Sequence, residues 1–90
     1  MKRLKPTRGH NILGRHIRQA RLQIKPEMSQ ADLAARLSVR GISVDRPTVT
    51  RIENGRRYLR DFEIRAIARV LRVSVAWLFR EVSDPAPLNR

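Results

Sequence analysis

The sequence predicts an all-α domain of five short helices, and three observations support this prediction. Apolar residues recur at spacings of three and four, which is the period of a helix with one buried face. Residues typical of helix N-caps stand just before most of these apolar runs. No segment shows a convincing alternation of apolar and polar residues, which is the pattern of a half-buried strand.

The first two helices are predicted from their caps and their ends. Asn11 is a suitable N-cap for the first helix, which must end by Lys25 because the residue before Pro26 avoids helical angles. Ser29 is expected to cap the second helix, with Asp32 as the other half of a capping box. The apolar faces of the two helices are Leu13, Ile17, Ala20 and Ile24, and then Leu33, Ala34 and Leu37.

The connection between the second and third helices leaves two alternatives open. Gly41 is a natural helix stop, so either the second helix runs to about Arg40 or the connection is a wider loop. Asp45 is expected to cap the third helix, and Pro47 falls in its first turn, where a missing N–H costs nothing. Asn54 and Gly55 are typical of its end.

Two further helices follow, and the chain ends flank them. Asp61 is expected to cap the fourth helix and Ser74 a short fifth one. The expected apolar positions are Ile64, Ile67, Ala68 and Leu71, and then Val75, Trp77, Leu78 and Phe79. Residues 1–10 are expected to form a basic flexible arm, 11–80 the domain, and 81–90 a flexible tail.

Charge is the feature that points most directly to a partner. Twenty Lys and Arg face eight Asp and Glu, so the formal net charge is +12, and the first acidic residue is Glu27. Such a chain attracts a polyanion, of which DNA is the most abundant. Charge alone does not separate DNA from RNA, the ribosome or anionic lipid.

The residue inventory argues against several other classes. The chain has no cysteine, and His10 and His16 stand without further ligands at suitable spacing, so no metal or other cofactor is expected. No catalytic set of side chains and no phosphate-binding glycine loop is present, so we expect no enzyme. No apolar stretch approaches a membrane span or a secretory signal, so we expect a cytoplasmic protein associated with the nucleoid.

The segment between Ser29 and Gly55 carries a specific resemblance. SQADLAARL followed by PTVTRIENG resembles the helix-turn-helix of the Xre family, the lambda-repressor and Cro type. The resemblance extends over about residues 12–79, and it implies the five-helix lambda-repressor-like fold. This sequence departs from the family pattern in the unusually long connection between helices 2 and 3, SVRGISVDR.

The resemblance also implies how DNA is bound. The third helix enters the major groove, and the expected base-contacting residues are Arg46, Pro47, Thr48, Thr50 and Arg51. The expected phosphate-contacting residues are Ser29, Gln30, Arg40, Arg56, Arg57 and Tyr58. The arm is expected to contribute Lys2, Arg3, Lys5 and Arg8. Arg21 and Glu53 resemble a structural ion pair of the family.

The function that the resemblance favours is transcriptional repression. The protein is expected to act as a homodimer that binds a short palindromic operator. Trp77 and Phe79 are candidates for its dimer interface, although such aromatics are often core. Three alternatives stay open: an antitoxin that binds a toxin protein as well as its operator, a protein-interaction module, and an RNA- or ribosome-associated protein. The arginines of the third helix argue against the module, and the few aromatics argue against a reader of single-stranded RNA.

Overall fold

The computed structural model describes residues 10–81, and this part of the chain forms five α-helices and no strand. They are α1 (Gly14–Gln23), α2 (Gln30–Val39), α3 (Arg46–Glu53), α4 (Asp61–Leu71) and α5 (Val75–Phe79). The predicted five-helix fold is therefore confirmed. Apart from His10 and Glu81, the predicted arm and tail lie outside the described residues.

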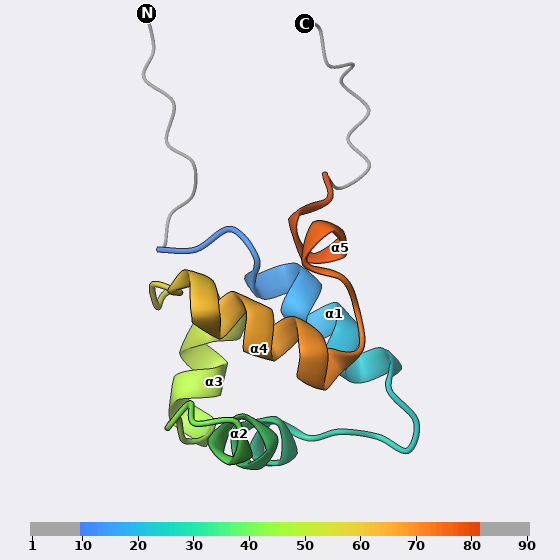
Figure 1. Ribbon diagram of the computed structural model, residues 1–90, viewed down its shortest axis with the longest axis vertical. Helices are drawn as coiled ribbons and strands as arrows, with labels where there is room; N and C mark the ends of the chain where they lie inside the picture. The colour runs from blue at the N-terminus through green and yellow to red at the C-terminus, as the bar shows by residue number, and fades with distance from the viewer. Residues whose placement is uncertain (1–9, 82–90) are drawn as a thin grey trace, which may run out of the picture.

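The helices enclose one core between two distinct ends of the molecule. α2 packs against both α3 and α4, whereas α1 packs against α3, α4 and α5. Figure 1 shows α2 and α3 at the end of the molecule opposite α5, with α4 crossing between them. The helix-turn-helix pair and the terminal helix therefore present separate surfaces.

Every helix contributes at least one fully buried side chain to this core. The largest are Ile17, Leu33, Leu37, Val49, Ile67 and Leu78. Removing a side chain of this size from water stabilises the fold by about 1.5–3 kcal/mol. Because all five helices share this burial, the short α3 and α5 are held by packing rather than by their own helix propensity.

Three of the predicted helix caps are present. The Ser29 hydroxyl accepts a hydrogen bond from the Asp32 N–H at 3.0 Å, and the Asp32 carboxylate accepts one from the Ser29 N–H at 2.9 Å. Asp45 accepts from the Thr48 N–H at 3.0 Å, and Ser74 caps α5 with the same geometry. These bonds satisfy N–H groups that have no partner within their own helix.

The prediction that Asp61 caps α4 is wrong. Arg60 occupies the N-cap position with extended backbone angles, and Asp61 is the first helical residue. Glu63 performs the capping instead, because its carboxylate accepts a hydrogen bond from the Arg60 N–H at 2.9 Å. Both acidic side chains lie in the first turn of the helix, where negative charge is favourable.

The connection between α2 and α3 follows the first of the two alternatives, the longer helix. α2 continues to Val39, and Arg40 is its C-cap. Gly41 follows with φ +87°, a left-handed conformation that favours glycine, and the Ile42 N–H donates to the Leu37 carbonyl at 2.9 Å. Ile42 is buried in the core, so it anchors the segment that leads to α3.

Candidate DNA-binding surface

The outer face of α3 presents the side chains that the sequence analysis assigned to base contacts. Arg46, Pro47 and Arg51 are exposed, and Thr48 and Thr50 are half-buried. The opposite face carries Val49, Ile52 and Glu53, all of them buried. The structure therefore places the five candidate base-contacting residues on one short helix whose inner face is fixed in the core.

A chain of hydrogen bonds along this outer face orients Arg51. The Thr48 hydroxyl donates to Asp45 Oδ1 at 2.6 Å, and Arg51 Nη2 donates to the Thr48 hydroxyl oxygen at 3.1 Å. These bonds to the Thr48 side chain and N–H lower the pKa of the Asp45 carboxyl. Asp45 is thus more than an N-cap, because it also fixes the hydroxyl to which the guanidinium is bound.

On its inner side, α3 is joined to α1 by a buried ion pair. Arg21 Nε donates to Glu53 Oε2 at 2.6 Å, and Arg21 Nη2 donates to Oε1 at 3.0 Å. Arg21 Nη1 also donates to the Met28 carbonyl at 3.0 Å. The hydrogen bond from Arg21 to Glu53 raises the Arg21 pKa, so the guanidinium stays charged. The structural pairing expected from the resemblance is present as a contact.

Gln30 links the start of α2 to α3 through both ends of its amide. Its oxygen accepts from the Thr50 hydroxyl at 2.9 Å, and its nitrogen donates to Glu53 Oε1 at 3.0 Å. Both the expected phosphate contact of Gln30 and the expected base contact of Thr50 therefore compete with an internal hydrogen bond. The amide nitrogen carries a second N–H, which is the donor left for an external acceptor.

Asn11 connects the start of α1 to the end of α3. The prediction that Asn11 is the N-cap of this helix is wrong by two residues, because Leu13 occupies the N-cap position and Gly14 is the first helical residue. Its Oδ1 accepts from the N–H groups of Leu13 and Gly14, at 2.8 and 2.9 Å. Its Nδ2 donates to the carbonyls of Ile52 and Arg57, at 3.1 and 2.9 Å. An asparagine before an apolar run predicts the first pair of bonds, but no local pattern predicts the second.

The residues expected to contact phosphates lie in different settings. Arg56 is exposed just after α3, and Ser29 is occupied as the cap of α2. Arg57 makes a bidentate ion pair with Glu63, with N···O distances of 3.0 and 3.2 Å, and this pairing had no signal in the sequence. Tyr58 is exposed and its ring stacks on His10 at a centroid distance of 4.3 Å.

One candidate for a phosphate contact, Arg40, lies away from α3. Arg40 is exposed at the end of α2, where it lines a groove against α4 rather than the recognition surface. The arm residues Lys2, Arg3, Lys5 and Arg8 lie outside the described residues.

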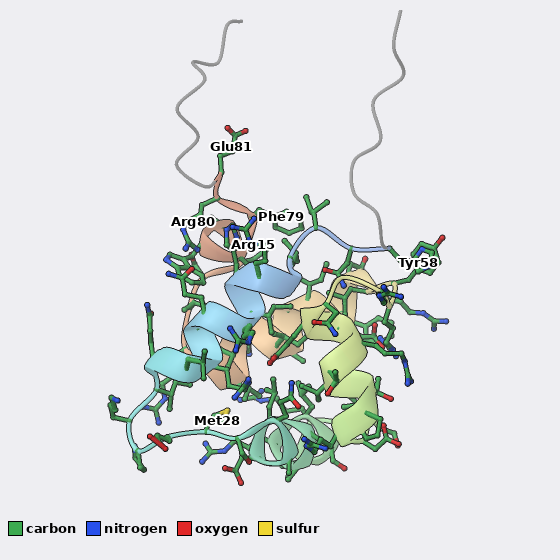
Figure 2. The ribbon with its side chains drawn as sticks, turned by 180° about the vertical axis from the view of Figure 1, so that it is seen from behind. Arg15, Met28, Tyr58, Phe79, Arg80 and Glu81 are labelled. Atoms are coloured by element: carbon green, nitrogen blue, oxygen red, sulfur yellow. The ribbon has the colours of Figure 1, made fainter. Side chains whose placement is uncertain are left out.

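The two aromatic residues of α5, Trp77 and Phe79, differ in burial. Trp77 is half-buried against the core, and the Arg80 guanidinium lies 3.6 Å from the centroid of its ring. Phe79 remains 46% exposed. Figure 2 shows Phe79 and Arg80 at the same end of the molecule as Arg15, while Tyr58 lies on the other side. Phe79 is therefore the member of the pair that is open to a partner.

These elements define a class of protein. Two helices joined by a turn, the second with an exposed polar and basic face, on a scaffold of three more helices, form a helix-turn-helix domain. No helix in residues 10–81 has the length and apolar character needed to cross a membrane.

Comparison with known proteins identifies the family. The family model described as Helix-turn-helix matches residues 17–78, which is more than half of the chain. The chain belongs to this family, the Xre and lambda-repressor-like helix-turn-helix proteins, which are DNA-binding transcription regulators. Neither the curated proteins nor the solved structures yielded a match.

Proposed function

We propose that this protein is a sequence-specific regulator that places α3 in the major groove of double-stranded DNA. The observation that carries the proposal is the outer face of α3, where Thr48 and Asp45 orient the guanidinium of Arg51. An oriented guanidinium donates two parallel hydrogen bonds to O6 and N7 of guanine, which is the commonest specific base contact. Ordering this side chain before binding also reduces the entropy that recognition costs.

Neighbouring side chains complete the proposed base-contacting set. Arg46 is exposed in the first turn of α3 and supplies a second guanidinium. Pro47 and the methyl groups of Thr48 and Thr50 suit apolar contact with thymine methyl groups, a role that leaves the threonine hydroxyls in their internal hydrogen bonds.

Phosphate contacts would fix the protein on the duplex. Arg56 suits this role because it is exposed directly after α3. Arg57 would have to leave its ion pair with Glu63, so we assign it to the structure of the α3–α4 turn instead. The remaining N–H of the Gln30 amide, at the start of α2, is a further phosphate donor.

The protein would act as a homodimer on a palindromic operator and repress transcription by occupying a promoter. Phe79 supports this part, because an exposed aromatic side chain on the terminal helix suits an interface between two copies. Two recognition helices related by a two-fold axis would then read half-sites about 34 Å apart.

Selection from a random pool of duplex DNA at near-physiological salt tests this function. We expect a palindrome to be enriched and to bind roughly 10³-fold more tightly than scrambled DNA of the same composition. Salt must be held constant, because phosphate contacts make the affinity steeply salt-dependent. Absence of enrichment, together with binding that disappears as salt rises, would leave only a basic surface and would refute sequence-specific regulation.

A further inference from the structure

An open groove of about 690 Å³ between α2 and α4 gathers four arginines. Its lining residues are Arg36, Val39 and Arg40 of α2, with Arg69, Val70 and Arg72 from α4 and its C-terminal end. The four arginines are exposed, and none of them takes part in the ion pairs found in residues 10–81, which join Arg21 to Glu53 and Arg57 to Glu63. The groove is therefore a concentration of positive charge, in which only Arg36 has a nearby carboxylate, that of Asp32 one turn earlier on α2.

This groove lies on a different flank of α2 from the recognition helix. Gln30 faces α3, to which it is hydrogen-bonded, whereas Arg36 and Arg40 face the C-terminal half of α4. The nearest acidic side chain on α2 is Asp32, which is one turn before Arg36 and is engaged in the capping box with Ser29. A ligand in the groove would thus not need to displace anything bound along α3.

The backbone at Arg72 adds an independent observation. Arg72 adopts φ +60° and ψ +40°, the left-handed conformation in which helices usually place glycine. A side chain that is not glycine costs stability in this conformation. The chain nevertheless carries a long cation at this position, directed to the same groove as three other arginines.

The apolar residues of the groove indicate what kind of anion it suits. Val39 is 87% exposed and stands on the same helix as Arg36 and Arg40, while Val70 is buried in the groove floor. A nucleic-acid backbone offers an exposed valine only the C–H groups of its sugars, which lie between charged phosphates. An amphipathic peptide helix carries both carboxylates and apolar side chains on one face.

Spacing favours the same ligand. Arg36 and Arg40 are four residues apart, so they are neighbours along one helix face, about one turn apart, and Arg69 and Arg72 line the opposite side of the groove. Carboxylates separated by one turn on a second helix match this spacing, and each arginine can bind a carboxylate through two hydrogen bonds.

We propose that the groove between α2 and α4 binds an acidic amphipathic helix of a partner protein. Its carboxylates would pair with the four arginines, and an apolar side chain between them would cover Val39. This proposal does not rest on the DNA-binding function, because it involves a different flank of α2. If the protein binds DNA through α3 and a partner through this groove, the partner can bind the regulator while the regulator occupies its operator.

A designed peptide of 15 residues serves as the probe. It carries glutamates at positions 1, 5, 8 and 12 with leucines beside them on the same face, and a control peptide of equal composition distributes these residues around the helix. Binding to the full chain is followed by fluorescence anisotropy and by NMR shifts at physiological salt. We expect the patterned peptide to bind about tenfold more tightly than the control and to shift residues of the groove, since both charge and apolar contact are matched.

Two charge-matched variants separate the groove from general electrostatics. Arg36→Gln/Arg40→Gln removes two charges from the groove, and Arg18→Gln/Arg65→Gln removes two exposed charges elsewhere on α1 and α4. We expect the first variant to lose about tenfold in affinity for the patterned peptide and the second to lose less than about twofold. Val39→Asn should also weaken binding, because it removes the apolar contact.

Three results would overturn the proposal. The first is equal affinity for the two peptides, or equal losses in the two double variants, which would show unspecific attraction. The second is NMR shifts on α3 rather than in the groove. The third is a DNA duplex or tripolyphosphate that shifts the groove residues at lower concentration than the patterned peptide, which would make the groove a phosphate site. Thermal melting of each variant checks that it is folded.

Discussion

The two flanks of α2 use arginine and its partners in opposite ways. On the flank toward α3, Gln30 and Glu53 bind each other, and Glu53 holds the buried guanidinium of Arg21. On the flank toward α4, Arg36 and Arg40 are exposed and form no ion pair within residues 10–81. The first flank is a closed polar network, whereas the second is an open charged surface.

Burial and pairing, rather than net charge, separate the arginines that hold the fold from those that are open to a partner. Net charge does not tell which arginines bind a partner, because a buried and paired arginine is committed to the fold. Arg21 and Arg57 are of this kind, each bidentate with a glutamate. An exposed arginine without a partner contributes little to stability, so it stays available to a binding partner.

Breaking the closed network should have the largest effect. Glu53→Ala leaves the Arg21 guanidinium buried without its carboxylate, which should cost about 3–5 kcal/mol of unfolding free energy. In a small domain this is a large part of the total stability. Urea unfolding followed by circular dichroism measures it.

Two variants serve as references for that experiment. Arg21→Met/Glu53→Met removes both charges and should cost less than Glu53→Ala, because no lone charge stays buried. Arg36→Gln/Arg40→Gln on the open flank should change stability by no more than about 0.5 kcal/mol. An equal loss in the Glu53 variant and this surface variant would contradict the distinction between the two flanks.

The closed network also depends on the close approach of α1 to α3. A Cβ added at Gly14 would lie 2.5 Å from the Glu53 carbonyl oxygen and 2.6 Å from that of Ile52. Both are backbone atoms, so Gly14→Ala should separate the two helices and cost about 1–3 kcal/mol. Urea unfolding of this variant beside Arg18→Ala, an exposed position on the same helix, measures the cost; equal stability of the two would show that α1 moves freely.

Local signals predicted the helices well and the network poorly. Ser29, Asp45 and Ser74 cap helices as their residue types and positions indicate, because a cap is a contact between residues three apart. Asp61 is not the cap because the helix already begins at Asp61, with Arg60 in the N-cap position, and it is Glu63 that accepts a hydrogen bond from the Arg60 N–H. Capping chemistry alone does not rank two such neighbours.

The site was predictable where helical geometry alone decides exposure. Arg46, Pro47 and Arg51 are exposed because Val49 and Ile52 fix which face of α3 is buried. The links between distant segments, such as Gln30 to Thr50, depend on how α2 and α3 cross, and the sequence does not contain that angle. The resemblance to the Xre family predicted the pairing of Arg21 with Glu53, which are 32 residues apart.

Recognition by α3 should depend on the orientation of Arg51. Arg51→Ala is expected to weaken binding to the selected operator by about 1–3 kcal/mol and to relax the preference at one base pair. Thr48→Val removes the hydroxyl that binds the guanidinium and should weaken operator binding by about 1 kcal/mol.

Thr48→Ser separates orientation from general structure, because it keeps the hydroxyl and should restore the base preference. Quantitative binding to the operator and to single-base variants of it measures both effects. If Arg51→Ala weakens binding to operator and to random DNA equally, Arg51 only neutralises phosphate. If Thr48→Val and Thr48→Ser behave alike, the hydroxyl does not position Arg51.

A second paired arginine allows a test by pH. Burial raises the pKa of the Glu63 carboxyl, but hydrogen bonds from the Arg57 side chain and the Arg60 N–H outweigh it, so the pKa lies below its ordinary value of 4.5. A carboxyl with a lowered pKa in the folded state stabilises the protein above the unfolded pKa, and this contribution is lost as pH falls through the folded value.

Glu63→Gln should therefore cost about 1.5 kcal/mol at pH 7. The difference from the original protein should narrow below about pH 4, where the carboxyl begins to take up its proton. Urea unfolding of both proteins at pH 7 and at pH 3 gives the comparison, and a difference that is the same at both values would exclude a charged Glu63 as the source of the stabilisation.

The smallest expected effect has the opposite sign and belongs to the open flank. Arg72→Gly places at φ +60° the residue that favours this conformation, and it should stabilise the fold by about 0.5–1 kcal/mol. Arg72→Ala removes the guanidinium but keeps a Cβ in the left-handed conformation, so it should bring no gain. If both variants lose affinity for the patterned acidic peptide while only the glycine variant gains in thermal melting, then the fold carries a strained arginine at this helix end for the sake of binding. A glycine variant no more stable than the alanine variant would show that Arg72 adopts its backbone conformation without strain.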